Sequence, residues 1–160
     1  DRLEGGDGHD LLRGSTGLDT IYGGNGNDTL LGDSHADHLN GGANNDWVSG
    51  GSGNDTLYGG AGNDTLIGGT GADALVGGSG VDSFVFHKGH GSDRITDFQI
   101  GTDRLMIDDA LIGRSVARFF DNFVRETSTG VVIDFGNGDK IAVNGSGVTI
   151  ESIADDILIF

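Results

Sequence analysis

Apolar residues recur at every ninth position through the first half of the chain. They are Leu12, Ile21, Leu30, Leu39, Val48, Leu57, Leu66, Leu75 and Phe84. An isolated nine-residue unit could not bury its one apolar side chain, so the units are expected to stack. Two units make one coil of eighteen residues with a turn on each side, and strands of successive coils then lie about 4.8 Å apart. The pattern predicts an all-β fold in which each side of the coil forms a parallel sheet.

A glycine-rich turn closed by an aspartate precedes each apolar position. The frame is clearest in GGNGNDTLL (residues 23–31) and GGAGNDTLI (residues 59–67), and aspartate recurs every nine residues from Asp1 to Asp82. A tight turn requires positive φ at several positions, which glycine adopts without a Cβ clash. Of the 32 glycines, 23 lie before residue 87. We therefore expect turns on both edges of the coil, each ending in an aspartate.

Stacking places aspartates two units apart about 5 Å from each other, where like charges repel by roughly 3 kcal/mol at an effective dielectric near 20. A divalent cation between successive turns would reverse this repulsion. Calcium accepts six to eight oxygens from carboxylates and backbone carbonyls, whereas magnesium requires a stricter octahedron and zinc prefers His or Cys. Of the 25 acidic residues, 22 are Asp, the shorter and stiffer ligand. The sequence therefore favours calcium.

The frame GGxGxDxUx resembles the calcium-binding nonapeptide of the RTX (repeats-in-toxin) family. The resemblance implies a parallel β-roll, a right-handed calcium-binding β-solenoid, with a C-terminal β-rich cap. Candidate calcium ligands are the carboxylates of Asp10, Asp19, Asp28, Asp37, Asp46, Asp55, Asp64, Asp73, Asp82 and Asp93, with turn residues Gly23, Gly24, Asn25, Gly26, Gly41, Gly42, Ala43, Asn44, Gly50, Gly51, Ser52, Gly53, Gly59, Gly60, Ala61, Gly62, Gly68, Gly69, Thr70, Gly71, Gly77 and Ser79.

Pairing each turn with the turn two units later gives up to seven sites in the regular repeats. Turns that depart from the repeat frame are expected to form weaker sites. The turn GDSHAD (residues 32–37) has Asp33 and His35 at two glycine places, so the two sites that use Asp37 are expected to be the weakest. The segment KGHGSD (residues 88–93) resembles a tenth, offset turn, whose Asp93 is expected to complete a site with Asp73.

The composition changes after residue 86, which suggests a repeat region over residues 1–86 and a capping segment over residues 87–160. Alternation around Asn137 and Gly138 in VVIDFGNGDKIAV (residues 131–143) predicts a hairpin with a type I′ turn. The acidic and then apolar end, from Ser152 to Phe160, resembles the uncleaved C-terminal signal of RTX substrates of type I secretion. A terminal edge strand would have the same pattern.

Several functional classes find no support in the residues. The chain has no Cys, and its formal net charge of −16 argues against a nucleic-acid partner. No apolar stretch reaches the length of a membrane span. We find no HExxH or GxSxG motif, and we interpret the five histidines as turn and surface residues rather than zinc ligands. The chain begins in mid-repeat with Asp1-Arg2-Leu3-Glu4, as expected of a piece of a longer protein.

Two functions remain. In the first, the chain is a non-enzymatic module of a secreted bacterial protein that folds on binding calcium after export, with the type I secretion machinery and an upstream domain as partners. Such parents include toxins, proteases, lipases, polysaccharide-modifying enzymes and adhesins. In the second, it binds a polysaccharide or another surface through Trp47 and Tyr58. Leu11, Leu31, Trp47 and Ile67 are expected to form an outward apolar stripe, which packs on the cap or a neighbouring domain or binds carbohydrate.

Overall fold

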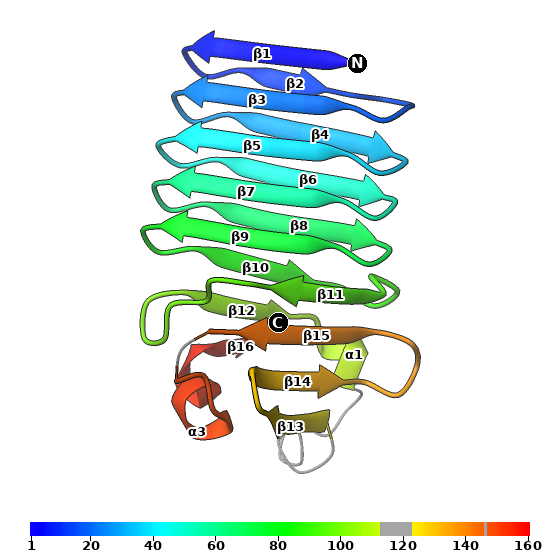
Figure 1. Ribbon diagram of the computed structural model, residues 1–160, viewed down its shortest axis with the longest axis vertical. Coiled ribbons are helices and arrows are strands. Elements are labelled where there is room, and N and C mark those ends of the chain that lie inside the picture. The colour runs from blue at the N-terminus through cyan, green and yellow to red at the C-terminus, as the bar shows by residue number, and fades with distance from the viewer. Residues whose placement is uncertain (113–122, 146) are drawn as a thin grey trace.

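The protein is described by a computed structural model that covers residues 1–112, 123–145 and 147–160. The chain winds into a stack of coils in which two sheets face each other across a narrow core, with the N-terminus at one end and a cap at the other (Figure 1). The predicted all-β parallel solenoid is confirmed. None of the helices in the described ranges is long and apolar enough to cross a membrane.

Odd-numbered strands of the repeats form one sheet and even-numbered strands form the other. The nine-stranded sheet has the order β1-β3-β5-β7-β9-β11-β15-β14-β13, and the seven-stranded sheet has the order β16-β12-β10-β8-β6-β4-β2. The strands are β1 (Arg2–Asp7), β2 (Leu11–Arg13), β3 (Thr20–Asn25), β4 (Thr29–Ser34), β5 (His38–Ala43), β6 (Trp47–Ser52), β7 (Thr56–Ala61), β8 (Thr65–Thr70), β9 (Ala74–Ser79), β10 (Ser83–Phe86), β11 (Ser92–Ile95), β12 (Arg104–Ile107), β13 (Val124–Thr127), β14 (Gly130–Asp134), β15 (Lys140–Asn144) and β16 (Ile157–Ile159).

Register within each sheet follows the eighteen-residue coil. Leu39 of β5, for example, lies between Ile21 of β3 and Leu57 of β7. Most repeat strands have six residues, because the first glycines of each turn continue the ladder, as Gly24 does opposite Gly42. Paired glycines lack the side chains that would crowd this part of the ladder.

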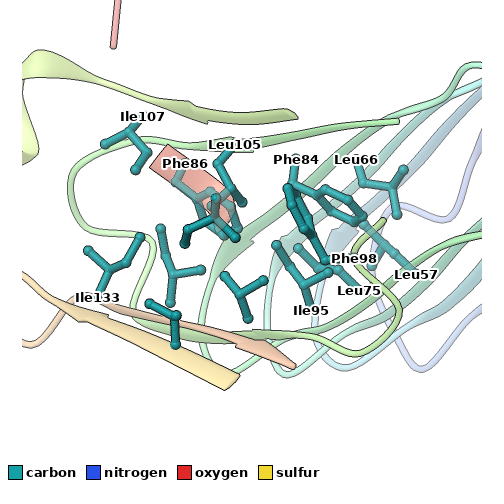
Figure 2. Packing of buried hydrophobic residues seen from close by; sticks show 14 of the residues in the cluster. Leu57, Leu66, Leu75, Phe84, Phe86, Ile95, Phe98, Leu105, Ile107 and Ile133 are labelled. Carbon is teal, nitrogen blue, oxygen red and sulfur yellow. The ribbon is translucent and has the colours of Figure 1, made fainter. Parts of the chain in front are cut away.

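The predicted core residues lie between the two sheets. Eight of the nine apolar residues of the period are fully buried, and Leu12, in the first coil, is partly buried. The same core continues into the cap, where Phe84, Phe98 and Ile95 pack beside Leu66 and Leu75 (Figure 2). Both sheets also run past residue 86, since β11 and β12 pair in parallel with β9 and β10. The division of the chain at residue 86 stays a prediction.

The cap differs from its predicted details. β14 and β15 form the expected hairpin, but the register pairs Asp134 with Lys140 and leaves a five-residue loop. Gly136 and Gly138 have positive φ and Asn137 does not, so the predicted two-residue type I′ turn was wrong. The loop is longer because Asn137 and Asp139 bond within it.

The end of the chain forms a strand in the folded protein. After α1 (Asp109–Ile112), α3 (Ile150–Ile153) and a 3₁₀ turn at Ala154–Asp156, β16 pairs in parallel with β12. Ile157 and Ile159 pack against the core. The edge-strand interpretation of the terminal pattern is therefore observed. Its use as a secretion signal stays a prediction.

Candidate metal sites at the turn edges

The aspartates that close the turns form two columns, one along each edge of the roll. The first Asp column contains Asp10, Asp28, Asp46, Asp64 and Asp82, and the second contains Asp19, Asp37, Asp55, Asp73 and Asp93. In each column, one carboxylate oxygen (Oδ1) accepts a hydrogen bond from the backbone N–H of the aspartate one coil earlier. The bond from Asp46 N to Asp64 Oδ1 is 2.8 Å long, and that from Asp73 N to Asp93 Oδ1 is 3.1 Å long.

The other carboxylate oxygen (Oδ2) of each column member is buried and has no hydrogen-bond partner. This holds for Asp10, Asp19, Asp28, Asp37, Asp46, Asp55, Asp64, Asp73, Asp82 and Asp93. These are the ten aspartates that the sequence analysis selected. A buried carboxylate oxygen without a partner is costly, because burial removes the water that would solvate its charge. Each orphaned oxygen therefore marks a position where a cation would be stabilised.

In seven of the turns, a backbone carbonyl oxygen lies near the orphaned Oδ2 atom. A Cβ atom placed on the first glycine of these turns would lie within 3.0 Å of both the orphaned Oδ2 and the carbonyl oxygen of the first glycine one coil later. The seven turns begin at Gly5, Gly14, Gly23, Gly32, Gly41, Gly50 and Gly59. Two oxygens thus converge beside a residue that has no side chain to occupy the space.

This donor set fits calcium. Within the described ranges, no three His, Cys, Asp or Glu side chains gather where they could hold one ion. An ion in a turn must therefore take much of its coordination from backbone carbonyls, which calcium accepts readily. The Asp Oδ2 atoms and the first-place glycine carbonyls would hold it, and its charge would offset the repulsion within each column.

The remaining predicted turn residues have other roles in the stack. Gly24, Gly42, Gly51, Gly60 and Gly69 have positive φ and lie where a Cβ would strike the carbonyl of the preceding coil. Carbonyls at the third place accept N–H groups of the preceding coil, as Ala61 O does from Asn44 N at 2.7 Å. Each of these carbonyls keeps a second lone pair. Their role as calcium ligands stays a prediction.

The degenerate turn at residues 32–37 keeps the geometry of the regular turns. Asp33 and His35 both have positive φ, and Arg13 pairs with the Asp33 carboxylate. Asp37 accepts the N–H of Asp19 at 2.8 Å, and its Oδ2 is orphaned like the others. The turn therefore accommodates two non-glycine residues in the left-handed region and keeps the hydrogen bond between Asp19 and Asp37.

Two aspartates that the sequence analysis did not select end the columns. Asp103 accepts the N–H of Asp82 at 3.1 Å and that of Gln99 at 2.8 Å, so both of its carboxylate oxygens are bonded. Asp139 accepts the N–H groups of Gly89 and Gly91. The signal for Asp103 was its place in Gly101-Thr102-Asp103, which matches Gly91-Ser92-Asp93, but its spacing of 21 residues from Asp82 departs from the period.

Burial raises the pKa of the column carboxylates from Asp37 onward. The pKa values of Asp46, Asp55 and Asp64 are each raised to about 6, with burial as the first cause and the neighbouring aspartates of the column adding to it. Burial likewise raises the pKa of Asp93. The folded state without metal therefore holds more protons than the unfolded chain between about pH 4 and pH 6.

This difference predicts how the calcium-free protein responds to pH. Because the folded-state pKa lies above the unfolded one, the stabilisation is present at pH 4 and is lost as the pH rises through 6. Circular dichroism in calcium-free buffer should show more β structure at pH 4.5 than at pH 7.5, where the chain is largely disordered. Calcium binding should change in the opposite direction and weaken below pH 6, because protons compete for the same oxygens. A calcium-free β signal that grows as the pH rises over this window would contradict the assignment.

The structure separates the residues proposed for carbohydrate binding. Trp47 points outward from the seven-stranded sheet and Tyr58 points outward from the nine-stranded sheet, so the two lie on opposite faces. They cannot form one platform. Leu11, Leu31, Trp47 and Ile67 do share one sheet, but Leu11 is 72% exposed and Trp47 is 46% exposed. Within the described residues the cap therefore leaves these two uncovered, and packing of the stripe on the cap was wrong.

Comparison with known proteins agrees with this geometry. A family model described as the RTX calcium-binding nonapeptide repeat matches four times, at residues 1–30, 31–66, 49–84 and 58–92. No curated protein sequence shows significant similarity to the chain.

Two solved structures have the same fold. The AlgE6R3 subunit of the Azotobacter vinelandii mannuronan C5-epimerase is 30% identical over 79% of this chain and 79% of its own, with a TM-score of 0.59. The extracellular lipase LipA of Serratia marcescens is 18% identical, with a TM-score of 0.58. The lipase match covers all of this chain and 38% of the lipase.

Proposed function

Because the chain belongs to the family of RTX calcium-binding nonapeptide repeat proteins, we propose that it is a non-enzymatic module of a larger secreted protein that folds when it binds calcium outside the cell. The observation that carries the proposal is the set of ten buried, orphaned Oδ2 atoms along the two turn edges. A folded state that buries so many unpaired carboxylate oxygens is poorly stable without cations. Calcium binding and folding are then one equilibrium.

The proposed place of the module is within a larger extracellular protein. AlgE6R3, to which the chain is similar, is described as a subunit of an epimerase. The lipase shares the fold and is extracellular, and the chain corresponds to 38% of its length. No pocket opens among the described residues, which suits a stabilising role better than catalysis.

Folding that depends on calcium would assist export of the chain. Calcium is scarce in the cytosol and abundant outside, so a chain whose folding needs calcium stays extended while the type I machinery threads it. It becomes compact on arrival outside. Folding at the exit would hinder movement back through the channel. The C-terminal segment is the part that we propose the exporter reads.

The number of ions that the roll holds tests this proposal. Native mass spectrometry should detect several bound calcium ions, up to about seven if each converging oxygen pair holds one. Gly41→Ala should lower that number, because its Cβ would lie between Asp46 Oδ2 and Gly59 O. Crowding of this kind costs about 1–3 kcal/mol.

Asn40→Ala is the matched control, since Asn40 precedes Gly41 and its side chain points to the outer face of β5. The control should bind as many ions as the parent protein. Equal ion counts for Gly41→Ala and Asn40→Ala would contradict the placement of the sites. Absence of bound calcium in the parent would refute the proposed function itself.

A further inference from the structure

One exposed aromatic side chain lies on the outer face of the seven-stranded sheet. Trp47, the single tryptophan of the chain, lies on the outer face of the seven-stranded sheet and is 46% exposed. The register places Thr29 of β4 and Thr65 of β8 directly beside it, one on each side. Within the described residues, neither threonine hydroxyl makes a hydrogen bond. The strand that carries Trp47 is therefore flanked by two strands, about 4.8 Å away, that each carry a free threonine hydroxyl at the same register.

The charge on this face differs from that on the turn edges. Among the outward residues of β2, β4, β6, β8 and β10, the one acidic side chain is Asp33, and it is paired with Arg13. The carboxylates that give the chain its net charge of −16 lie mainly in the turns. No pocket opens among the described residues, so a ligand here would lie flat on the sheet.

We propose that Trp47, with Thr29 and Thr65, forms a binding platform for an uncharged, extended polysaccharide. The indole ring offers an apolar surface to the C–H face of a sugar, and the flanking hydroxyl groups can bond to the sugar hydroxyls. The acidic turn edges repel a polyanion on either side of the face. Polar residues alternate with the apolar ones along both outward rows, as Thr29 does between Leu11 and Trp47 and Ser49 does between Leu31 and Ile67, so polar and apolar groups lie side by side on this face. The platform requires the folded roll and is independent of export.

The single tryptophan provides a direct readout. Calcium-loaded protein is titrated with cellohexaose, mannohexaose and chitohexaose, with oligogalacturonate as the anionic counterpart. Tryptophan fluorescence should change saturably with at least one of the uncharged sugars and not with oligogalacturonate. No saturable change with any of the three uncharged sugars would overturn the proposal. A change that depends on protein concentration without sugar would also overturn it, because the face would then bind a second copy.

Variants locate the binding to this face. Trp47→Ala should weaken the sugar affinity, measured by calorimetry, by about tenfold or more, as expected when a central aromatic contact is removed. Tyr58→Ala, an aromatic change on the opposite face, should bind like the parent. Thr29→Val and Thr65→Val keep the side-chain shape and should each weaken binding several-fold. Calcium-induced circular dichroism must match the parent for each variant. Parent-like affinity in Trp47→Ala would contradict the platform.

Discussion

Replacing Asp46, Asp55 and Asp64 together by alanine is expected to abolish calcium-induced folding of the roll. Each of the three carboxylates belongs to two stacked pairs. The variant therefore loses the pairs 28–46, 46–64, 64–82, 37–55 and 55–73, which are five of the seven pairs in the repeats. The Asp column on each turn edge then lacks its ligands in the middle of the stack. Since each coil contacts only its neighbours, the ends cannot compensate for the missing centre.

Circular dichroism over a calcium titration measures this effect. The triple variant should keep a disordered spectrum at calcium concentrations that fold the parent. A control with the same change in charge replaces the exposed Asp109, Glu151 and Asp155 by alanine and should fold like the parent. If repulsion between carboxylates were the whole effect of the columns, the triple variant would fold without calcium. That outcome would contradict a role for these aspartates as ligands.

Deleting residues 101–160 is expected to abolish export. The deletion removes the terminal Asp155-Asp156-Ile157 run and all of β16, which we propose the type I machinery reads while the chain is unfolded. In the folded state Ile157 and Ile159 lie against the core, so these two side chains are accessible to an exporter only before the chain folds. The repeats that remain keep the regular turns and should bind calcium weakly.

Secretion from a cell that carries the cognate transporter checks this prediction. The triple aspartate variant is the matched control, because it keeps the C-terminal segment. It should enter the exporter but leave it slowly and reach the medium unfolded. Export of the shortened chain at the normal rate would refute the secretion part of the proposal. The chain would then be a calcium-stabilised spacer.

The sequence predicted the regular part of the fold almost residue by residue. Each nine-residue unit has one apolar side chain and one aspartate at constant spacing, and stacking leaves a single register that buries both. Leu57 and Leu66 are therefore buried as expected, and Asp55 and Asp64 lie in the two columns. Substitutions at glycine places did not break the register, because Asp33 and His35 adopt the left-handed conformation there.

Features that depend on contacts distant in the sequence were harder to predict. Asp103 and Asp139 end the columns, but their spacing follows the path of the cap rather than the repeat. In the β14–β15 loop, Asp139 accepts the N–H groups of Gly89 and Gly91, and these distant contacts accompany a longer loop than the two-residue turn that Asn137-Gly138 favours locally. The joint platform of Trp47 and Tyr58 was the avoidable error, because the two residues lie in successive units and the predicted coil already places successive units in opposite sheets.

The central claim is that calcium binding and folding are one event, and a calcium titration of the chelator-treated parent followed by circular dichroism tests it most directly. The account predicts a largely disordered spectrum in chelator and a cooperative gain of β signal, with a midpoint near the ~10⁻⁴ to 10⁻³ M typical of extracellular calcium modules. Magnesium at the same concentrations should not produce the change. A β spectrum that is already complete in chelator and does not respond to calcium would contradict the account.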